Sequence, residues 1–343
     1  MALMRPNLER VDPRFLLYAY LGPAFQDTLR AHTIPGSTVD RILLTEFPTF
    51  PISTPGLADQ RRIAAILGAL DDKIELNRRM NATLEAMARA LFQSWFVDFD
   101  PVRAKAEGRQ PAGMDAATAA LFPDSFEDSA LGPIPRGWRV AALPDVIDVN
   151  PPRSLRAGEV APYLDMANMP TDSARAIEVV ERAFGSGMRF IGGDTLVARI
   201  TPCLENGKTA FVDFLSSGCV GWGSTEYIVL CPRAPLPEEY AYFLARTEGF
   251  RNFAIANMTG TTGRQRVPAN SFDHFLMAVP DAAPARKFGE TARSTIRLMR
   301  ARDEESRTLA AIRDALLPKL LSGELRVGEA NSIAEVAAET TTS

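Results

Sequence analysis

The chain has 343 residues, of which 46% are hydrophobic and 23% are charged, and its formal net charge is −4. This composition is typical of a globular protein with two or more domains, and it excludes a disordered or fibrous chain. The negative charge excludes a surface broadly coated for nucleic acid, but a local basic cleft stays compatible, because affinity depends on the few cations that reach phosphate.

No apolar run approaches the ~20 residues that a membrane span needs, and Arg5 and Glu9 interrupt any signal-peptide pattern. We therefore expect a cytoplasmic protein with no membrane partner. The 3 cysteines are odd in number and widely spaced, and there are 2 histidines. This pattern predicts reduced thiols and no metal site.

The first segment of the chain is residues 1–56. Within it, residues 15–55 are interpreted as strands and turns left over from a larger domain, and they end in closely spaced prolines. Residues 57–97 predict a long helix, because apolar side chains recur at spacings of three and four. A length near 40 residues favours a coiled coil, and a helix packed on its own domain is the alternative. Two asparagines interrupt this seam, where they would fix register at a cost in stability. The predicted pairing residues of this helix are Ile63, Leu67, Leu70, Ile74, Asn77, Asn81 and Leu84.

Residues 98–132 are rich in Pro and Gly and are interpreted as a linker, with a short helix around 116–121. Residues 133–283 alternate short runs of Val, Ile and Phe with turn residues, which predicts a mixed α/β domain of irregular strands and long loops. Within it, residues 237–256 predict one amphipathic helix.

Residues 284–323 predict the second long helix, which Gly323 ends, and residues 324–343 are small and polar and predict a disordered tail. The middle of this helical seam is again polar. Its predicted pairing residues are Met299, Arg302, Ser306, Leu309 and Leu316.

The end of the chain repeats its beginning. Residues 41–95 align with residues 266–320 without a gap at an offset of 225. Arg41 falls on Arg266, for example, and the helical phase is kept throughout. A repeat this long is not a solenoid. It predicts two equivalent halves and a target that also has two halves.

Three polar, turn-rich loops of the α/β domain predict contacts with DNA, because hydroxyls, amides and cations reach phosphates and base edges where glycine permits close approach. The loops span residues 201–208, 221–226 and 259–266, and the third has a counterpart in residues 35–41 that is one residue shorter. A solvated structural turn is the alternative for each loop. Trp222 is expected in the core, with base stacking as the alternative. The candidate DNA-binding residues are Asn206, Lys208, Ser224, Thr225, Glu226, Thr261, Thr262, Arg264, Gln265 and Arg266.

Two motifs resemble catalytic signatures but lack required residues. Asn150-Pro151-Pro152 resembles the amino-methyltransferase motif, but Arg153 stands in place of the aromatic residue. Gly207-Lys208-Thr209 resembles the end of a P-loop, but the first glycine is replaced by Pro202. We therefore expect no catalytic site in this chain.

These features together resemble the DNA-specificity subunit of type I restriction-modification systems. The most specific stretches are residues 92–102, 133–138, 199–211, 223–227 and 316–323. The resemblance implies two target-recognition domains, and two long helices that pair as an antiparallel coiled coil. It also implies a non-catalytic subunit that docks two methyltransferase subunits and, in the full complex, restriction subunits. S-adenosylmethionine, ATP and Mg would then be used by those partners, and this chain would hold no cofactor.

The sequence departs from this pattern because residues 1–56 contain only the last piece of a first recognition domain. Either the start of the sequence is misplaced or truncated, or this is a shortened subunit. A shortened subunit could act as a homodimer on a symmetric, interrupted site. The alternative is a fragment that binds methyltransferase subunits without productive DNA recognition.

Overall fold

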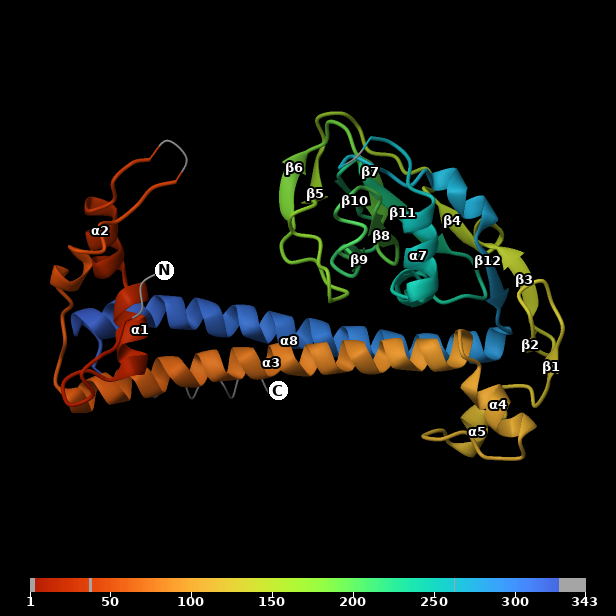
Figure 1. The fold of residues 1–343 in the computed structure, drawn as a ribbon, viewed down its shortest axis with the longest axis horizontal. Coiled ribbons are helices and arrows are strands. Elements are labelled where there is room, and N and C mark those ends of the chain that lie inside the picture. The colour runs from red at the N-terminus through yellow and green to blue at the C-terminus, as the bar shows by residue number, and fades with distance from the viewer. Residues whose placement is uncertain (1–3, 37–38, 262, 327–343) are drawn as a thin grey trace. The chain divides into compact units, whose positions relative to one another are not determined.

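In the computed structural model, which describes residues 4–36, 39–261 and 263–326, the chain forms two compact units (Figure 1). The first unit is Met1–Met80 with Ala301–Ser343, and the second is Asn81–Arg300. Two long helices, α3 (Leu57–Phe96) and α8 (Ala282–Ser322), contribute to both units. Gly323 follows α8 with a φ of +77°, a left-handed conformation that glycine adopts without strain.

The first unit adds two short helices, α1 (Pro13–Leu21) and α2 (Pro23–Ala31), and the 3-10 turn η1 (Phe47–Thr49). The prediction of strands in residues 15–55 was therefore wrong. Asp12 caps α1 by accepting hydrogen bonds from the amides of Arg14 and Phe15, and proline at the first helical position suits a helix start.

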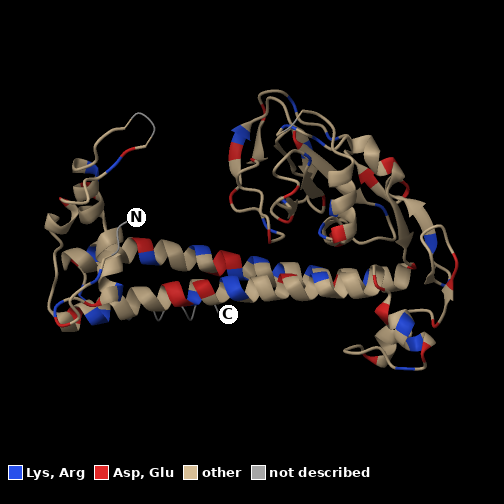
Figure 2. Cartoon of the chain, in the orientation of Figure 1, with Lys and Arg blue, Asp and Glu red and all other residues tan. Residues whose placement is uncertain are grey.

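The long helices pair in antiparallel orientation. In the first unit, Arg313 Nη1 donates to Asp71 at 2.6 Å, and Asn77 Nδ2 donates to Glu305 at 2.8 Å and to the Ser306 hydroxyl at 3.3 Å. As the position on α3 moves toward its C-terminus, the partner on α8 moves toward its N-terminus. Charged residues of both signs follow the two helices (Figure 2). The predicted helix pairing is confirmed.

The predicted pairing residues lie along this seam in both units. Asn77 Nδ2 also lies 3.5 Å from the carbonyl oxygen of Arg302, and Asn81 Nδ2 donates to the Met299 carbonyl at 3.1 Å. Each seam asparagine therefore bonds the facing helix, as register control requires. The apolar members are buried or partly buried, namely Ile63, Leu67, Leu70, Ile74, Leu309 and Leu316 in the first unit and Leu84 and Met299 in the second.

The second unit contains both β-sheets and helices, as expected for the predicted mixed α/β domain. One sheet has the order β4-β11-β8-β9, another has the order β6-β5-β10-β7, and two strand pairs, β1-β2 and β12-β3, accompany them. Tyr227 and Leu230 of the central β11 are fully buried. The strands are β1 (Phe126–Glu127), β2 (Ile134–Pro135), β3 (Arg139–Ala142), β4 (Ile147–Val149), β5 (Val160–Leu164), β6 (Val180–Ala183), β7 (Met188–Ile191), β8 (Thr195–Ala198), β9 (Thr209–Phe211), β10 (Val220–Gly223), β11 (Tyr227–Pro232) and β12 (Leu276–Val279). The 3-10 turns are η2 (Leu143–Asp145) and η3 (Ala269–His274).

The segment predicted as a linker, residues 98–132, packs into the core of the second unit. It contains α4 (Asp100–Ala106) and α5 (Ala116–Ala119), the latter within the predicted short helix. Val102 is 0% exposed and Phe122 is 2% exposed. The ring of Phe122 lies 5.0 Å from that of Trp95. Burial of these apolar groups holds a proline- and glycine-rich segment in place.

The single helix predicted over 237–256 was also wrong. Two helices occupy it, α6 (Glu239–Ala245) and α7 (Glu248–Ala256). Thr247 is extended, and its hydroxyl accepts from the Phe250 amide as the N-cap of α7. A threonine cap of this kind favours a new helix start over continuation.

The structure extends the internal repeat. At the offset of 225, α2 falls on α7, and the start of α3 at Leu57 falls on the start of α8 at Ala282. The isolated bridge between Ile34 and Arg41 falls on the bridge between Thr259 and Arg266. The bridged residues are equally far apart in the two halves, so the expected one-residue difference is wrong.

The two halves differ in the burial of α1 and of its equivalent at the offset of 225, α6. In α6, Tyr242 is fully buried, and Arg246, which follows α6, is 9% exposed. The equivalent residues of the first unit, Leu17 and Leu21, are 52% and 51% exposed. The α6 helix packs against β8, β9 and β11, whereas the first unit has no such β layer among its described residues.

Candidate nucleic-acid interface

The three predicted DNA-contacting loops converge. The amide of Thr201 donates to the carbonyl of Gln265 at 3.0 Å, and the amide of Arg199 donates to the carbonyl of Glu226 at 2.9 Å. A bridge joins Ile200 to Arg266. Loops that are far apart in sequence thus form one cluster, which we call the loop cluster, made of residues 199–208, 224–226, 259–261 and 263–266.

Within the loop cluster, Arg266 is held by Glu226. Its Nε lies 2.9 Å from both carboxylate oxygens, and its Nη2 lies 2.7 Å from one of them. Its Nη1 donates to the carbonyl of Arg264 at 3.1 Å. The hydrogen bond that Arg266 donates to the Glu226 carboxylate raises the pKa of Arg266. Because each nitrogen has an internal acceptor, Arg266 joins two loops, and its predicted role in base reading stays a prediction.

Lys208 is likewise engaged inside the domain. Its Nζ donates to the carbonyls of Met166 and Ala167, the former at 2.5 Å. The Ser224 hydroxyl accepts from the Glu226 amide at 3.1 Å. Both side chains therefore have a structural role in the loops, whatever they contribute to binding.

The remaining candidates present polar groups at the surface. Asn206, Thr225, Thr261 and Arg264 are exposed, and Gln265 is half-buried. Thr262 lies outside the described residues. Arg264 is therefore the exposed cation among the candidates, and it is the member best placed to contact a polyanion.

One residue that positions the loops was not found from the sequence. Arg246, just after α6, donates through Nη1 to the carbonyls of Thr171 and Gly207 and through Nη2 to those of Ser173 and Thr209. Buried carbonyls need such donors. Arg246 thus fixes the loop before β9 to the loop 171–173. The sequence gives no signal for it, since an arginine at a helix end is ordinarily solvated.

Arg246 continues into a buried polar chain that reaches α3. Its Nε donates to the Tyr242 hydroxyl at 3.0 Å, and that hydroxyl donates to Oε1 of Glu85. Burial raises the pKa of Glu85, and the bond from Tyr242 and the charges of Arg246 and Arg89 oppose that shift. This hydrogen-bond network connects α3 to the loops that precede β9.

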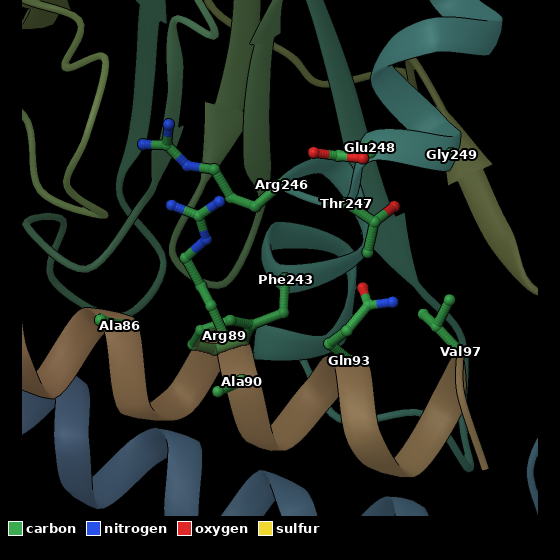
Figure 3. Close-up of a pocket in the computed structure, with 10 residues that line it drawn as sticks. All are labelled: Ala86, Arg89, Ala90, Gln93, Val97, Phe243, Arg246, Thr247, Glu248 and Gly249. Atoms are coloured by element: carbon green, nitrogen blue, oxygen red, sulfur yellow. The ribbon is translucent and has the colours of Figure 1, made fainter. Parts of the chain in front are cut away.

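A surface hollow of about 420 Å³ lies beside this hydrogen-bond network (Figure 3). Arg89 and Gln93 line it from α3, and Arg246 and Thr247 line it from the turn between α6 and α7. Small residues, Ala86 among them, keep the α3 wall open.

The segment Asn150-Pro151-Pro152-Arg153, which resembles a methyltransferase motif, has a structural role. Asn150 has a φ of +53°, and its Oδ1 accepts from the Val229 amide at 2.9 Å. Arg153 pairs with the buried Asp194 at 3.1 Å. The described ranges contain no group of three His, Cys, Asp or Glu suited to a metal ion. Within those ranges, no helix combines the length and hydropathy that crossing a bilayer would require.

Comparison with known proteins finds similarity to one class of protein. Residues 3–86 match the family described as "Type I restriction modification DNA specificity domain". The chain is 25% identical over 384 aligned residues to the type I restriction enzyme HindI specificity subunit of Haemophilus influenzae, a match that covers 94% of this chain and 80% of the relative. It is 23% identical to the MjaIX specificity subunit of Methanocaldococcus jannaschii, covering 86% of this chain and 65% of that protein. The resemblance to type I specificity subunits is confirmed.

The chain also matches solved structures at low sequence identity. The HsdS subunit of Thermoanaerobacter tengcongensis is 18% identical with a TM-score of 0.36, covering 94% of this chain and 73% of that one. The S subunit of the type I system from M. genitalium is 15% identical with a TM-score of 0.48, covering 92% and 74%.

Proposed function

We propose that this chain is the DNA-specificity subunit of a type I restriction-modification complex. In this role it reads one part of a split DNA site with the loop cluster of its second unit and does no chemistry itself. The chemistry, with S-adenosylmethionine, ATP and Mg, belongs to partner subunits.

The convergence of three separate polar loops carries this proposal. Base reading requires polar groups on a rigid support that several chain segments share. Here Arg246 and the pair of Arg266 with Glu226 hold the loops. Arg264 and Gln265 then remain available to the DNA major groove, where arginine favours guanine and glutamine favours adenine.

The paired long helices are proposed to dock methyltransferase subunits, two of them if both halves of the repeat are used. Their seam is apolar with polar register residues, whereas Met87 of α3 is 63% exposed and Leu76 of α3 is 49% exposed. Exposed apolar residues on such a helix offer contacts to a partner. Restriction subunits would join this assembly to complete the enzyme.

The test is selection of bound duplexes from a random library by the complex of this chain with its methyltransferase subunit. The proposal predicts enrichment of one motif in two separated parts. Enrichment that is the same without this chain would refute it. Two identical inverted halves would indicate that two copies act together on a symmetric site.

A second candidate function is the assembly fragment that binds methyltransferase subunits without reading DNA. The exposed Leu17 and Leu21, whose counterparts are covered in the second unit, favour an incomplete first half. A complex that assembles but enriches no sequence would support this alternative over the first.

A further inference from the structure

The sheet of order β6-β5-β10-β7 has an inner face in the core and an outer face. Leu164 and Phe190, both 0% exposed, belong to a hydrophobic cluster on the inner face. Tyr163, Trp222 and Arg189 are register partners across β5, β10 and β7. Because alternate residues of a strand point to opposite faces, these three share the outer face.

An arginine covers the tryptophan on this outer face. Trp222 is 4% exposed, yet it does not belong to the hydrophobic clusters of the described residues. The Arg182 guanidinium lies 4.8 Å from the centroid of Tyr163 and 5.7 Å from that of Trp222. The ring of Phe184 lies 5.3 Å from Trp222. The expectation that Trp222 is a core residue therefore holds for its burial but not for its surroundings.

A second arginine flanks the same rings. The Arg189 guanidinium lies 5.6 Å from the centroid of Phe184, whereas Arg182 is exposed on the edge strand β6. Neither arginine forms an ion pair with any carboxylate of the described ranges. The neighbouring Glu181 faces the opposite side of β6, and Glu159 accepts a hydrogen bond from the Arg156 amide at 3.1 Å. The outer face thus carries uncompensated positive charge.

We propose that this outer face, formed by Tyr163, Arg182, Phe184, Arg189 and Trp222, contacts the DNA phosphate backbone. An arginine stacked on an aromatic ring keeps its N–H edge free, and that planar edge fits phosphate bidentately. Phosphate contacts make up half to two-thirds of protein–DNA hydrogen bonds and set the register of the protein on the duplex. The inference rests on the proposed function and adds a positioning surface to the loop cluster.

The outer face is continuous with the loop cluster through β10. Trp222 lies two residues before Ser224, and the amide of Met188 approaches the carbonyl of Ser224 at 3.5 Å. Arg189 follows Met188 directly. One bound duplex can therefore engage both surfaces, which favours DNA over an unrelated acidic protein as the occupant.

The test uses the complex with the methyltransferase subunit and two labelled duplexes, one with the selected motif and one scrambled. Binding is measured over a series of salt concentrations for Arg182→Met/Arg189→Met, which keeps the apolar stems over the rings. We expect several-fold weaker binding to both duplexes by the same factor, and a salt slope lower by about 1 per arginine. Arg233→Met is the matched control, because Arg233 is exposed but already paired with Asp148.

Three results would overturn the inference. An unchanged affinity and salt slope, while the wild-type complex binds, would exclude phosphate contact. A loss confined to the motif duplex would assign base reading instead, and a loss of methyltransferase assembly would assign a protein partner. A wild-type complex that binds neither duplex would contradict the proposed function itself. If the double variant unfolds by circular dichroism, Arg182→Lys/Arg189→Lys decides, since phosphate contact requires that it keep the slope.

Discussion

Arg266 and Glu226 form a bidentate ion pair that joins two of the three polar loops, with Nε at 2.9 Å from both carboxylate oxygens. The two residues lie 40 positions apart: Glu226 is in the turn between β10 and β11, and Arg266 is in the loop that follows α7. The pair distinguishes the two arginines of this region, because Arg264 is exposed, whereas the guanidinium of Arg266 donates to Glu226 and to the carbonyl of Arg264.

This separation gives a prediction for base reading. Arg264→Ala should weaken binding to the selected motif by about 1–3 kcal/mol and relax preference at one base position. Fluorescence anisotropy with single-base variants of the motif measures both effects. Unchanged binding by Arg264→Ala and by Arg266→Ala would remove these residues from DNA recognition.

Arg266 should act through its partner. Arg266→Ala and Glu226→Ala should reduce DNA affinity by similar factors, and the double variant should be little worse than either, because each single change already breaks the pair. A double-mutant cycle on binding affinity measures this coupling. Additive losses would instead mean that each side chain contacts DNA independently.

The helix pair predicts that assembly depends on the seam. Leu67 is 0% exposed and Leu309 is 2% exposed, so Leu67→Asp or Leu309→Asp would bury an unpaired charge. Either variant should lose co-purification with the methyltransferase subunit before any change in site choice appears. Leu131→Asp is the control, because Leu131 lies outside the two long helices, is 45% exposed, and the change costs little folding energy. Intact complexes from both seam variants would contradict the coiled-coil account.

Substitution of Arg246, which lies outside the loop cluster, should strongly reduce the stability of the fold. Arg246→Ala leaves the carbonyls of Gly207 and Thr209 without their donor and Glu85 without a compensating charge. We expect a loss of about 3–5 kcal/mol in stability, as for removal of one member of a buried charged network. Thermal unfolding measures it, and faster proteolysis within 171–173 and 201–208 would locate it. Arg233→Ala, at an exposed ion pair screened by solvent, should leave the melting temperature almost unchanged.

Glu85 predicts a pH dependence with a defined sign. Burial raises its pKa in the folded state above the unfolded value of 4.5, so the folded state binds the proton more tightly. The contribution of Glu85 to stability therefore falls as pH rises above that unfolded pKa through the folded one. As pH rises above 4.5, the melting temperature of Glu85→Gln should increase relative to that of the wild type. Below pH 4.5 the difference between the two melting temperatures should not change. A difference in melting temperature that does not change with pH would contradict a raised pKa.

The sequence predicted the elements whose signal is local and periodic. The α3 and α8 helices begin and end within two residues of the predicted bounds, and Asn77 and Asn81 bond the facing helix. The structural repeat extends beyond the segment that the sequence alignment covers, since α2 and α7 share length and position although only Phe25 with Phe250 and Ala31 with Ala256 are identical.

Features that depend on long-range contacts were not predictable. The helical character of α1 depends on a cap at Asp12 and on packing of Phe15 and Tyr18 against α3, so a short apolar run was read as a strand. Nothing local marks Arg246 or Arg182 as different from solvated arginines. Their roles come from carbonyls and rings brought together by the fold.

The most direct test is base-resolution mapping of DNA methylation in cells that express the methyltransferase subunit with and without this chain. Our account predicts methylation at one split motif that requires this chain and that changes or weakens with Arg264→Ala. Methylation at the same sites without this chain, or an assembled complex that methylates no defined motif, would contradict the claim that this chain sets DNA specificity.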